Sequence, residues 1–449
     1  MLIKLKTERG IFIYNEDRTY LILTDSTSGM LQANKLLTGH AIKTELRPAP
    51  PEHGSVCAIA ILIEAIHLEQ AKSILKENQI SLTGIYENKR TKLDHLVAQL
   101  KGEIITDEFL KIIKQIEMGK DLTFEEIVYL LKMTNEKELD ILYNIADRMR
   151  REIVGDVVDI RGAIEFSNVC TKDCTYCGIR KNLLTLDRYR MSEEEIMEIV
   201  YELHDLGIQT VILQSGEDAW WTVDKINALM KRIKTETGMK ITLSVGVRTF
   251  DEYASFKKAG ANNYLLKVET TNPNIFKATH PDDDLDQRVQ CAKWLRELGY
   301  LNGSGMIIGL PEQTAEDIAN DILYFKEMGI NMIGIGPFVP AIGTPLQNLP
   351  HGNIELTLKA VAITRIVCKR VYLPATTALA SLDPKGQEKA LSVGANTIML
   401  VNTPKKYREN YQIYSSKLAV DIESAIKVVK AVNRELPSYL KIGAEDNES

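Results

Sequence analysis

The chain has 449 residues, of which 45% are hydrophobic and 26% are charged, and its formal net charge is −6. This length and composition are typical of a globular protein with two or three domains, and the acidic balance leaves no basic excess to hold a nucleic-acid backbone. No apolar run is long enough to span a bilayer, and residues 1–20 lack the apolar core of a signal peptide. We therefore expect a cytoplasmic protein that binds neither nucleic acid nor a membrane.

Residues 1–87 have the pattern of a small α+β domain. Apolar runs and turn residues predict strands and helices in the order β-α-β-β-α-β, at residues 20–24, 25–37, 42–46, 56–63, 68–77 and 81–86. This order is that of a ferredoxin-like fold. Residues 88–155 then change to the spacing of amphipathic helices, without any strand, and predict a helical connector.

From residue 156 to residue 402, strands and helices alternate. Strands are predicted at residues 157–166, 210–214, 241–245, 263–268, 303–308, 332–336, 372–375 and 397–400. Eight β-α units predict an α/β fold with a full (β/α)8 barrel of the TIM type, in which ligands bind on the loops that follow the strands. Residues 403–449 hold a tyrosine-rich stretch, a helix near residues 422–433 and a polar end.

Three of the six cysteines, Cys170, Cys174 and Cys177, stand in C-x3-C-x2-C spacing directly after the first barrel strand. Three thiolates on one loop can hold three irons of a 4Fe-4S cluster and leave the fourth iron open to a small molecule. A structural zinc site lacks its fourth ligand here, and a thioredoxin-like pair leaves Cys170 unexplained. We favour the open cluster, in a reducing and anaerobic setting. Cys291 and Cys368 lie in helical patterns and are expected to be packing residues.

The cysteine loop, with Tyr176 before its last cysteine, resembles the radical S-adenosylmethionine (SAM) superfamily. Two further motifs of that superfamily follow in order, Ser215 to Asp218 after the second strand and Gly305 to Glu312 (G-x-I-x-G-x-x-E) on the fifth. Alone, either motif is weak, because a turn also explains Ser215 to Asp218 and close backbone packing in a strand also explains the glycines. The resemblance implies that the free iron chelates SAM and that reductive cleavage gives a 5′-deoxyadenosyl radical. It also implies SAM contacts from Tyr176, Ser215, Gly216, Glu217, Gly305, Ile307 and Gly309.

Over residues 120–415 the chain resembles the HydE family of FeFe-hydrogenase maturases, in the biotin synthase-like branch, through EFSNVC, YCGIR, RYRMS, LQSGED, GIGPF and YRENYQIY. The resemblance implies that Glu269 and Arg288 bind polar groups of SAM and that Met332 contacts its adenosyl part or sulfonium. It further implies that a group of residues lines a substrate cavity inside the barrel: Arg161, Gln214, Thr376, Thr377, Met399, Tyr411 and Tyr414.

The residues by themselves leave structural interpretations open for several of these positions. Arg161 also suits an ion pair that closes the bottom of the barrel, and adjacent Thr376 and Thr377 also suit a strand. Tyr411 and Tyr414 would share one face if their stretch is helical, and core packing is their alternative role.

The chain departs from the HydE pattern near the barrel mouth. Lys267 and Val268 precede Glu269 where Arg-His is common, residues 341–343 replace His-Pro-Asp, and Val247 replaces an acidic residue. The later stretch YSSKLAVDIESAI lacks cysteine, so no second cluster is expected. These departures affect the expected substrate more than the SAM chemistry.

The proline-rich segment before SVCAIA resembles a sulfur/selenium carrier-like domain and implies that Cys57 is a carrier thiol. Burial of Cys57 in a strand is the equally weighted alternative.

The sequence thus predicts a radical SAM enzyme of the HydE type, acting in assembly of the diiron subcluster of FeFe hydrogenase. Its expected cofactors are a 4Fe-4S cluster and SAM. A reduced ferredoxin or flavodoxin would donate the electron, other hydrogenase maturases are candidate partners, and the substrate would be a small or organometallic molecule. The alternatives are a paralogue acting on a thioether, an amino acid or a sulfur/selenium compound, and an iron-sulfur carrier or scaffold, which would need neither the barrel nor the SAM motifs.

Overall fold

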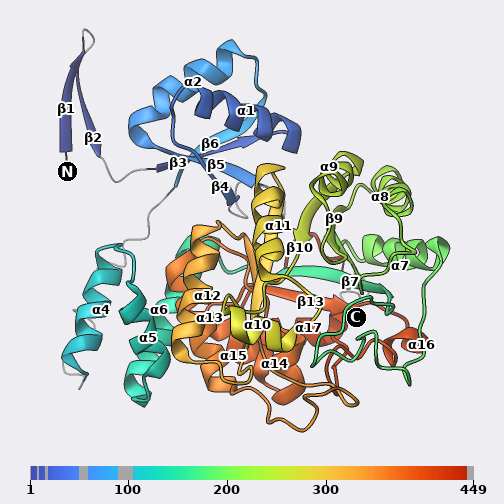
Figure 1. Cartoon of the computed structure of the whole chain (residues 1–449). Coiled ribbons are helices and arrows are strands. Elements are labelled where there is room, and N and C mark those ends of the chain that lie inside the picture. The colour runs from blue at the N-terminus through green and yellow to red at the C-terminus, as the bar shows by residue number, and fades with distance from the viewer. Residues whose placement is uncertain (1, 8–9, 16–18, 50–58, 89–104, 442–449) are drawn as a thin grey trace, which may run out of the picture. The chain divides into compact units, whose positions relative to one another are not determined.

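The computed structural model describes residues 2–7, 10–15, 19–49, 59–88 and 105–441 (Figure 1). It divides into two compact units, Met1–Lys92 with Glu152–Gly155, and Leu93–Arg151 with Asp156–Ser449. Cys57 lies outside the described residues, so its role as a carrier thiol stays a prediction. The predicted domain limits, at residues 1–87, 88–155, 156–402 and 403–449, also stay predictions.

The first unit has the predicted ferredoxin-like topology. Its elements follow in the order β3 (Thr19–Thr24), α1 (Thr27–Gly39), β4 (Glu45–Pro48), β5 (Ile59–Glu64), α2 (Leu68–Glu77) and β6 (Leu82–Asn88). The antiparallel sheet has the order β4-β5-β3-β6, and apolar strand residues such as Ile22 and Ile61 pack against Leu37 and Leu75 of the helices. A hairpin of β1 (Leu2–Thr7) and β2 (Gly10–Asn15), which the sequence pattern does not predict, precedes this fold.

The second unit contains seven parallel strands in one curled sheet, with the order β12-β11-β10-β9-β8-β7-β13. The strands are β7 (Asp159–Ser167), β8 (Thr210–Ser215), β9 (Lys240–Ser244), β10 (Ala261–Leu265), β11 (Leu301–Ile308), β12 (Met332–Pro337) and β13 (Thr397–Val401). The fourth strand is shorter at its end than predicted. Beyond it, Leu266 donates its N–H to the Gly303 carbonyl at 3.0 Å, so the chain still follows β11.

The seventh predicted strand, at residues 372–375, is reduced to two parallel bridges between β12 and β13. Tyr372 bridges Met332, and Pro374 bridges Thr397. The Tyr372 N–H donates to the Asn331 carbonyl at 2.8 Å, and the Ala375 N–H donates to the Thr397 carbonyl at 2.9 Å. Proline has no N–H for a regular ladder, which explains why this segment stays short. The segment nevertheless occupies the seventh of the eight strand positions, between β12 and β13, and completes the predicted barrel.

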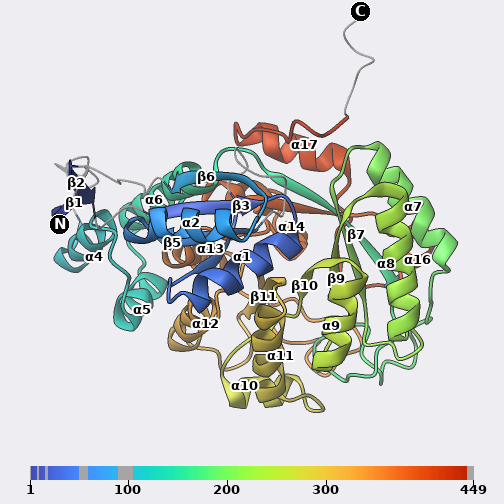
Figure 2. The same ribbon diagram turned by 90° about the horizontal axis from the view of Figure 1, so that it is seen from above.

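The longer helices between the strands, including α7, α8, α9, α11 and α12, lie outside the strands (Figure 2). Their bounds, with those of the short helices, are α7 (Glu193–Asp205), α8 (Val223–Thr237), α9 (Phe250–Ala259), α10 (Pro273–Thr279), α11 (Leu285–Glu297), α12 (Ala315–Glu327), α13 (Ile354–Cys368), α14 (Thr377–Leu382), α15 (Gly386–Ser392), α16 (Lys405–Arg408) and α17 (Ile422–Ala431). Cys291 in α11 and Cys368 in α13 are buried, as expected of packing residues. No helix in the described part of the chain is long and apolar enough to cross a membrane.

The helical connector consists of α4 (Asp107–Glu117), α5 (Phe124–Lys132) and α6 (Glu136–Val154). Thr123 and Glu126 form a reciprocal capping box at the start of α5, which satisfies N–H groups that the helix itself leaves free. Helix α5 packs against α12 and α13. The connector is therefore joined to the outer helices of the barrel by its apolar face.

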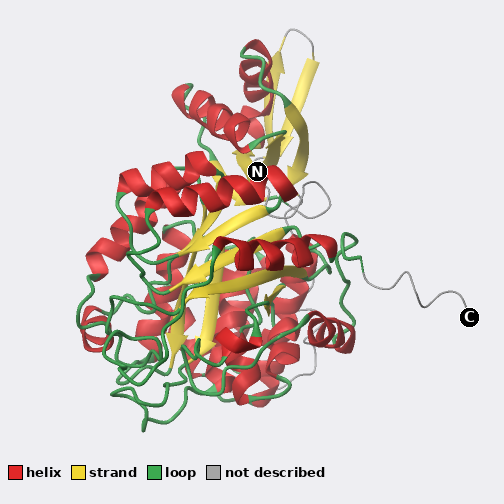
Figure 3. Ribbon diagram, turned by 90° about the vertical axis from the view of Figure 1, so that its right-hand side faces the viewer, coloured by secondary structure: helices red, strands yellow, loops and turns green. Residues whose placement is uncertain are grey.

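Long loops gather at one end of the strands (Figure 3). At this end a buried ion pair joins β7 to the segment that follows α16. Glu165 and Lys417 form the pair, with side chains 3% and 6% exposed, and Thr403 donates its hydroxyl to the same carboxylate at 3.1 Å. The segment 411–417 is a loop, so Tyr411 and Tyr414 do not share a helix face.

Replacing Lys417 with Met should destabilise the barrel, because Glu165 would remain as a buried carboxylate without its cation. We expect the free energy of unfolding in urea to fall by roughly 3 to 5 kcal/mol. The double variant Glu165→Gln/Lys417→Met should recover most of the loss, and Lys427→Met, at an exposed position of α17, serves as the control. An unchanged stability of Lys417→Met would contradict this role of the pair.

Candidate functional site

The cysteine loop follows β7 and is held in shape by backbone contacts rather than by a helix or strand. The Arg188 guanidinium donates to the carbonyls of Asn168 at 2.7 Å, Ile179 at 2.8 Å and Arg180 at 2.5 Å. The Arg180 N–H in turn donates to the Cys177 carbonyl at 3.1 Å. Arg188, which the sequence interpretation did not single out, therefore fixes both ends of the loop.

The three cysteines are free and half-buried. Burial raises the pKa of each thiol, to about 12 for Cys177, well above its ordinary range for Cys174, and above it for Cys170. The thiols are therefore protonated until a metal displaces the proton. Among the residues that the structure describes, no three Cys, His, Asp or Glu side chains converge on a single metal ion. In a cubane cluster each thiolate binds its own iron, so such convergence is not required.

The Ser215 to Asp218 motif lies directly against the cysteine loop. The Glu217 N–H donates to the Cys170 sulfur over 3.4 Å. A Cβ atom on Gly216 would lie 2.3 Å from the Val169 carbonyl oxygen, so only glycine permits this approach. Asp218 accepts two hydrogen bonds from Arg190, at 2.6 and 2.9 Å. Within this motif, Asp218 holds the turn in place through Arg190, whereas Glu217 contacts the cysteine loop.

Glu269 follows β10 and has a left-handed backbone, with φ 66°. Its N–H donates to the Gly305 carbonyl at 2.9 Å, and its carbonyl accepts the Ile307 N–H at 3.0 Å. A non-glycine residue with positive φ is often found at a functional position. The carboxylate of Glu269 pairs with Lys267 Nζ at 2.7 Å. The backbone of the G-x-I-x-G-x-x-E motif therefore holds Glu269 in place.

Asp321 on α12 supports the chain that follows Glu269. One of its carboxyl oxygens accepts the Thr271 N–H at 2.6 Å and the Thr271 hydroxyl at 2.7 Å. Burial raises the pKa of Asp321 to about 7, and the hydrogen bonds from Thr271 oppose that shift only in part. No sequence pattern pointed to Asp321, because a lone acidic residue in a helical pattern is usually exposed.

The glycine motif on β11 packs closely against neighbouring chain. A Cβ atom on Gly305 would lie 2.1 Å from the Gly334 carbonyl oxygen and 2.5 Å from Lys267 Cε, so the glycine leaves room for the lysine stem. Ile307 packs against a small cluster around Phe338 and Leu310. Gly309 donates its N–H to the Gln313 side chain at 2.7 Å.

Tyr176 is held by a histidine that the sequence interpretation missed. Its hydroxyl lies 3.0 Å from His280 Nε2, and its ring makes edge contacts with His280 and Phe338. Burial, with Arg288 nearby, lowers the pKa of His280 to about 3, so this imidazole is neutral. Thr175, next to Tyr176, donates its N–H to the Thr279 carbonyl at 2.9 Å. The cysteine loop is therefore joined to the end of α10.

The residues predicted inside the barrel fall into two groups. At the bottom, Arg161 is fully buried, donates to Asp159 at 2.6 Å and to the Met332 sulfur at 3.3 Å, and lies over the Tyr372 ring. Met399 on β13 is in register with Arg161 on β7 and faces the same side of the sheet. Arg161 therefore forms the ion pair at the bottom of the barrel that the sequence left open as its structural role.

At the other end, Gln214 is in register with Glu165, and Tyr411 is fully buried nearby. Tyr414 and Thr377 share a hydrogen bond between their hydroxyls. Thr376 donates its hydroxyl to the Ile335 carbonyl at 3.3 Å. Five of the seven predicted positions are only half-buried, so part of their surface stays accessible: Gln214, Thr376, Thr377, Met399 and Tyr414. Glu165 and Lys417, described above, belong to the same region.

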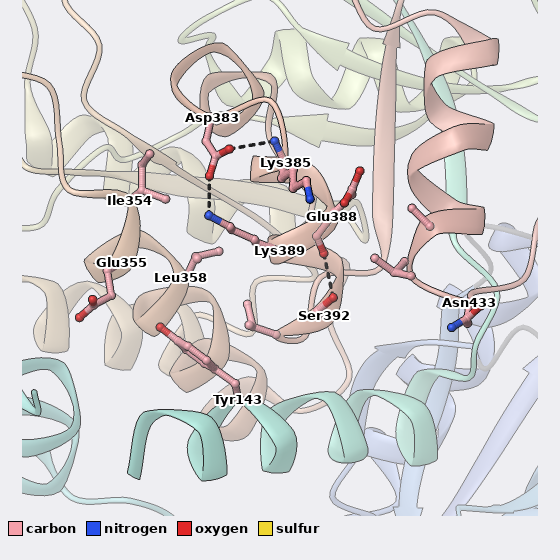
Figure 4. A pocket seen from close by; sticks show the side chains of 13 residues that line it. Tyr143, Ile354, Glu355, Leu358, Asp383, Lys385, Glu388, Lys389, Ser392 and Asn433 are labelled. Atoms are coloured by element: carbon pink, nitrogen blue, oxygen red, sulfur yellow. Dashed lines mark hydrogen bonds and ion pairs between the residues drawn. The ribbon is translucent and has the colours of Figure 1, made fainter. Parts of the chain in front are cut away.

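A cavity of about 730 Å³ lies elsewhere, between the connector and the outer helices (Figure 4). It is lined by residues of α6, α13 and α15, including Tyr143, Leu358 and Lys389, and by the end of α17. Asp383 pairs with Lys389 at its edge at 2.6 Å. The cavity shares no residue with the cysteine loop or with the predicted SAM and substrate contacts.

Comparisons with known proteins agree with the motifs. A family model described as "Radical SAM superfamily" matches residues 164–325, and one described as "Putative Se/S carrier protein-like" matches residues 19–87. The chain is 43% identical to the FeFe hydrogenase maturase subunit HydE of Thermotoga maritima over 310 residues, which are 69% of this chain and 88% of that protein.

Two solved structures have the same fold. Methylornithine synthase (PylB) has a TM-score of 0.66 and 23% identity, with 73% of this chain and 97% of that chain covered. HydG, a maturase of FeFe hydrogenase, has a TM-score of 0.65 and 21% identity, with 77% and 80% covered. The same barrel fold thus occurs in proteins with different functions, so these two likenesses support the fold of this chain and not a particular substrate.

Asp321 should make the stability of the barrel depend on pH. Its pKa of about 7 in the native state lies above the ordinary value of an aspartate in the unfolded chain. Between these two pKa values the native state therefore binds one proton more than the unfolded state. The stability present below about pH 4 is then lost as the pH rises through 7. Between pH 5 and pH 8 the wild type should lose roughly 3 kcal/mol of unfolding free energy relative to Asp321→Asn. The free energy of unfolding is measured with urea at each pH. If it depends on pH in the same way in the wild type and in Asp321→Asn, this assignment is wrong.

Proposed function

Because this chain belongs to the radical SAM superfamily and, within it, to the HydE family, we propose that Cys170, Cys174 and Cys177 bind three irons of a 4Fe-4S cluster. The fourth iron is left for SAM. The observation that carries the proposal is the Glu217 N–H directed at the Cys170 sulfur, because such donors stabilise a cluster thiolate. When bound and reduced, the cluster supplies the electron that cleaves SAM to methionine and a 5′-deoxyadenosyl radical.

The cysteine loop, the strand ends around it and the first turn of α11 supply the SAM contacts. Glu217, Glu269 and Arg288 offer charged groups that suit the amine, the carboxylate and the ribose hydroxyls of SAM. Tyr176, with its hydroxyl fixed by His280, offers a ring face of defined orientation. The backbone and apolar atoms of the remaining predicted contacts suit the adenosyl part and the sulfonium: Ser215, Gly216, Gly305, Ile307, Gly309 and Met332.

The substrate binds inside the barrel, among Arg161, Gln214, Thr376, Thr377, Met399, Tyr411 and Tyr414. Arg161 keeps its charge when buried and presents a planar set of donors, which suits cyanide or carboxylate. The hydroxyls of Thr377 and Tyr414 add donors near the mouth. Walls made by the strands exclude water from a radical formed there. An organometallic iron precursor with CO and cyanide ligands, processed toward the diiron subcluster of FeFe hydrogenase, fits this surface.

The partners follow from the same chemistry. A reduced ferredoxin or flavodoxin supplies the electron, and other hydrogenase maturases deliver or accept the precursor. Both are proposals that rest on the HydE relationship.

A paralogue that acts on another small molecule is the second candidate. Two observations favour it, the Lys267 and Val268 departure beside Glu269 and the N-terminal match to a Se/S carrier-like family. In this case the substrate is a thioether, an amino acid or a sulfur/selenium compound.

The full chain, reconstituted with iron and sulfide and reduced with dithionite without oxygen, should form 5′-deoxyadenosine from SAM. Replacing all three loop cysteines with Ala should abolish the product, because the cluster then has no ligands, and Cys368→Ala, at a buried cysteine outside the site, is the control. High-performance liquid chromatography measures the nucleoside. If the wild type with a full iron content forms none, both enzymatic functions are wrong and an iron-sulfur carrier is left.

Expression of this chain in a hydrogenase-producing strain that lacks its own HydE separates the two enzymatic functions. Restored hydrogen evolution is expected of the maturase. A chain that cleaves SAM in the assay above but restores no hydrogenase activity is the paralogue.

A further inference from the structure

A chain of alternating charges links the SAM contacts to the cysteine loop. Lys172, between Cys170 and Cys174, places its Nζ 3.9 Å from the Glu217 carboxylate and 3.3 Å from the Asp283 carboxylate. Asp283, before α11, accepts two hydrogen bonds from Arg288, from Nε at 3.0 Å and from Nη2 at 2.6 Å. Two predicted SAM contacts, Glu217 and Arg288, are thus joined through two residues to which the family resemblance gave no role.

The chain continues to the third charged SAM contact. Arg288 uses its remaining terminal nitrogen, Nη1, to donate to the Lys267 carbonyl at 2.5 Å. Lys267 in turn pairs with Glu269 at 2.7 Å. The contacts therefore run from Glu217 to Glu269, through ion pairs and the Lys267 carbonyl, across the loops that follow β7, β8 and β10 and the first turn of α11.

These side chains are shielded from water. The exposed fraction is 0% for the Asp283 side chain, 10% for Arg288 and 20% for Lys172. Charge interactions are much stronger at such positions than on an open surface, and each buried charge needs its partner. Lys172 lies between two carboxylates, those of Glu217 and Asp283, which would otherwise repel each other.

Backbone contacts fix the two central residues relative to each other. The Asp173 N–H donates to the Asp282 carboxylate at 3.1 Å, and the Lys172 ammonium also reaches the Asp282 carbonyl at 3.4 Å. The Lys172 carbonyl accepts the Lys181 N–H at 2.8 Å. Residues 172–173 and 282–283 are therefore held side by side, and a movement of the cysteine loop would move Asp283 and Arg288 with it.

We propose that Lys172 and Asp283 are positioning residues that hold Glu217 and Arg288 in place for SAM, so that SAM affinity depends on a lysine carried between two cluster cysteines. The inference rests on the proposed function. Neither residue needs to touch SAM. Lys172 neutralises and spaces the carboxylates, and Asp283 fixes the direction of the Arg288 guanidinium, because one of its carboxylate oxygens accepts hydrogen bonds from two nitrogens of that group.

The test uses the full reconstituted chain and four variants, Lys172→Met, Lys172→Arg, Asp283→Asn and the control Lys181→Met. Lys181 lies in the same loop, carries the same charge, and has a side chain 44% exposed in its pair with Asp282. Iron and sulfide per chain are measured first. The rate of SAM cleavage at varied SAM concentration then separates KM from kcat, and electron paramagnetic resonance records how SAM changes the spectrum of the reduced cluster.

Lys172→Met and Asp283→Asn should keep the iron content and the cluster spectrum without SAM. Each should raise the KM for SAM about ten- to a hundredfold, with a smaller effect on kcat, and should weaken the spectral change that SAM causes. Lys172→Arg should restore most of the affinity, and Lys181→Met should behave as the wild type. In the double variant Lys172→Met/Asp283→Asn, the KM for SAM should rise by less than the product of the two single increases, because both residues belong to one series of contacts.

Two results would overturn the inference. One is an unchanged KM in Lys172→Met and Asp283→Asn. The other is a loss of iron in Lys172→Met, because the lysine would then serve to build the loop and not to position SAM contacts. A wild type that has its cluster but shows no spectral response to SAM would instead overturn the proposed function itself, and with it this inference.

Discussion

The close approach of the end of β8 to the cysteine loop holds the whole site together. Gly216 lies so near the Val169 carbonyl that no side chain fits between them, and this contact brings the Glu217 N–H to the Cys170 sulfur. Asp218 fixes the same turn from behind through Arg190 and Ser167. A loop that carries three thiols is thereby held by the neighbouring strand, and the charged groups beside it acquire a defined position relative to the three sulfur atoms.

The supporting residues come from distant parts of the chain. Asp321 on α12 holds Thr271, His280 after α10 holds Tyr176, and Lys417 near the C-terminus neutralises Glu165. Each is buried and acts through a neighbour. This arrangement is typical of sites in which the groups that touch a ligand are oriented by further polar contacts behind them, because a buried polar group without a partner is costly.

The Lys267 and Val268 departure from the HydE pattern has a structural setting. Lys267 is part of the site rather than of the open surface. Its aliphatic stem passes Gly305, its carbonyl accepts a hydrogen bond from Arg288, and its ammonium pairs with Glu269. Val268 is buried, which leaves no polar group there to face a ligand. The cation at position 267 is thus retained as a lysine with a single point charge in place of the arginine fork, and this difference changes the ligand geometry that the position can serve.

Features with a local cause could be predicted from the chain alone. Periodic apolar residues indicated the ferredoxin-like order and the barrel, because burial of one face imposes a period on a helix or strand. The cysteine spacing and the two later motifs indicated the proposed metal ligands and the proposed SAM contacts, because these residues lie on strands or on the loops directly after them. The resemblance to HydE agrees with the 43% identity found to a HydE protein.

The side chains that support the site became apparent only in three dimensions. His280, Asp283, Asp321 and Lys417 belong to no motif, and Arg188 lies in RYRMS but was given no role. Their roles arise from contacts that only the folded chain brings together. The seventh predicted strand also became a pair of bridges, since its length depends on the spacing between β12 and β13 and on Pro374. Long-range contacts of this kind leave no periodic signal, because each depends on how separate loops meet at one end of the barrel.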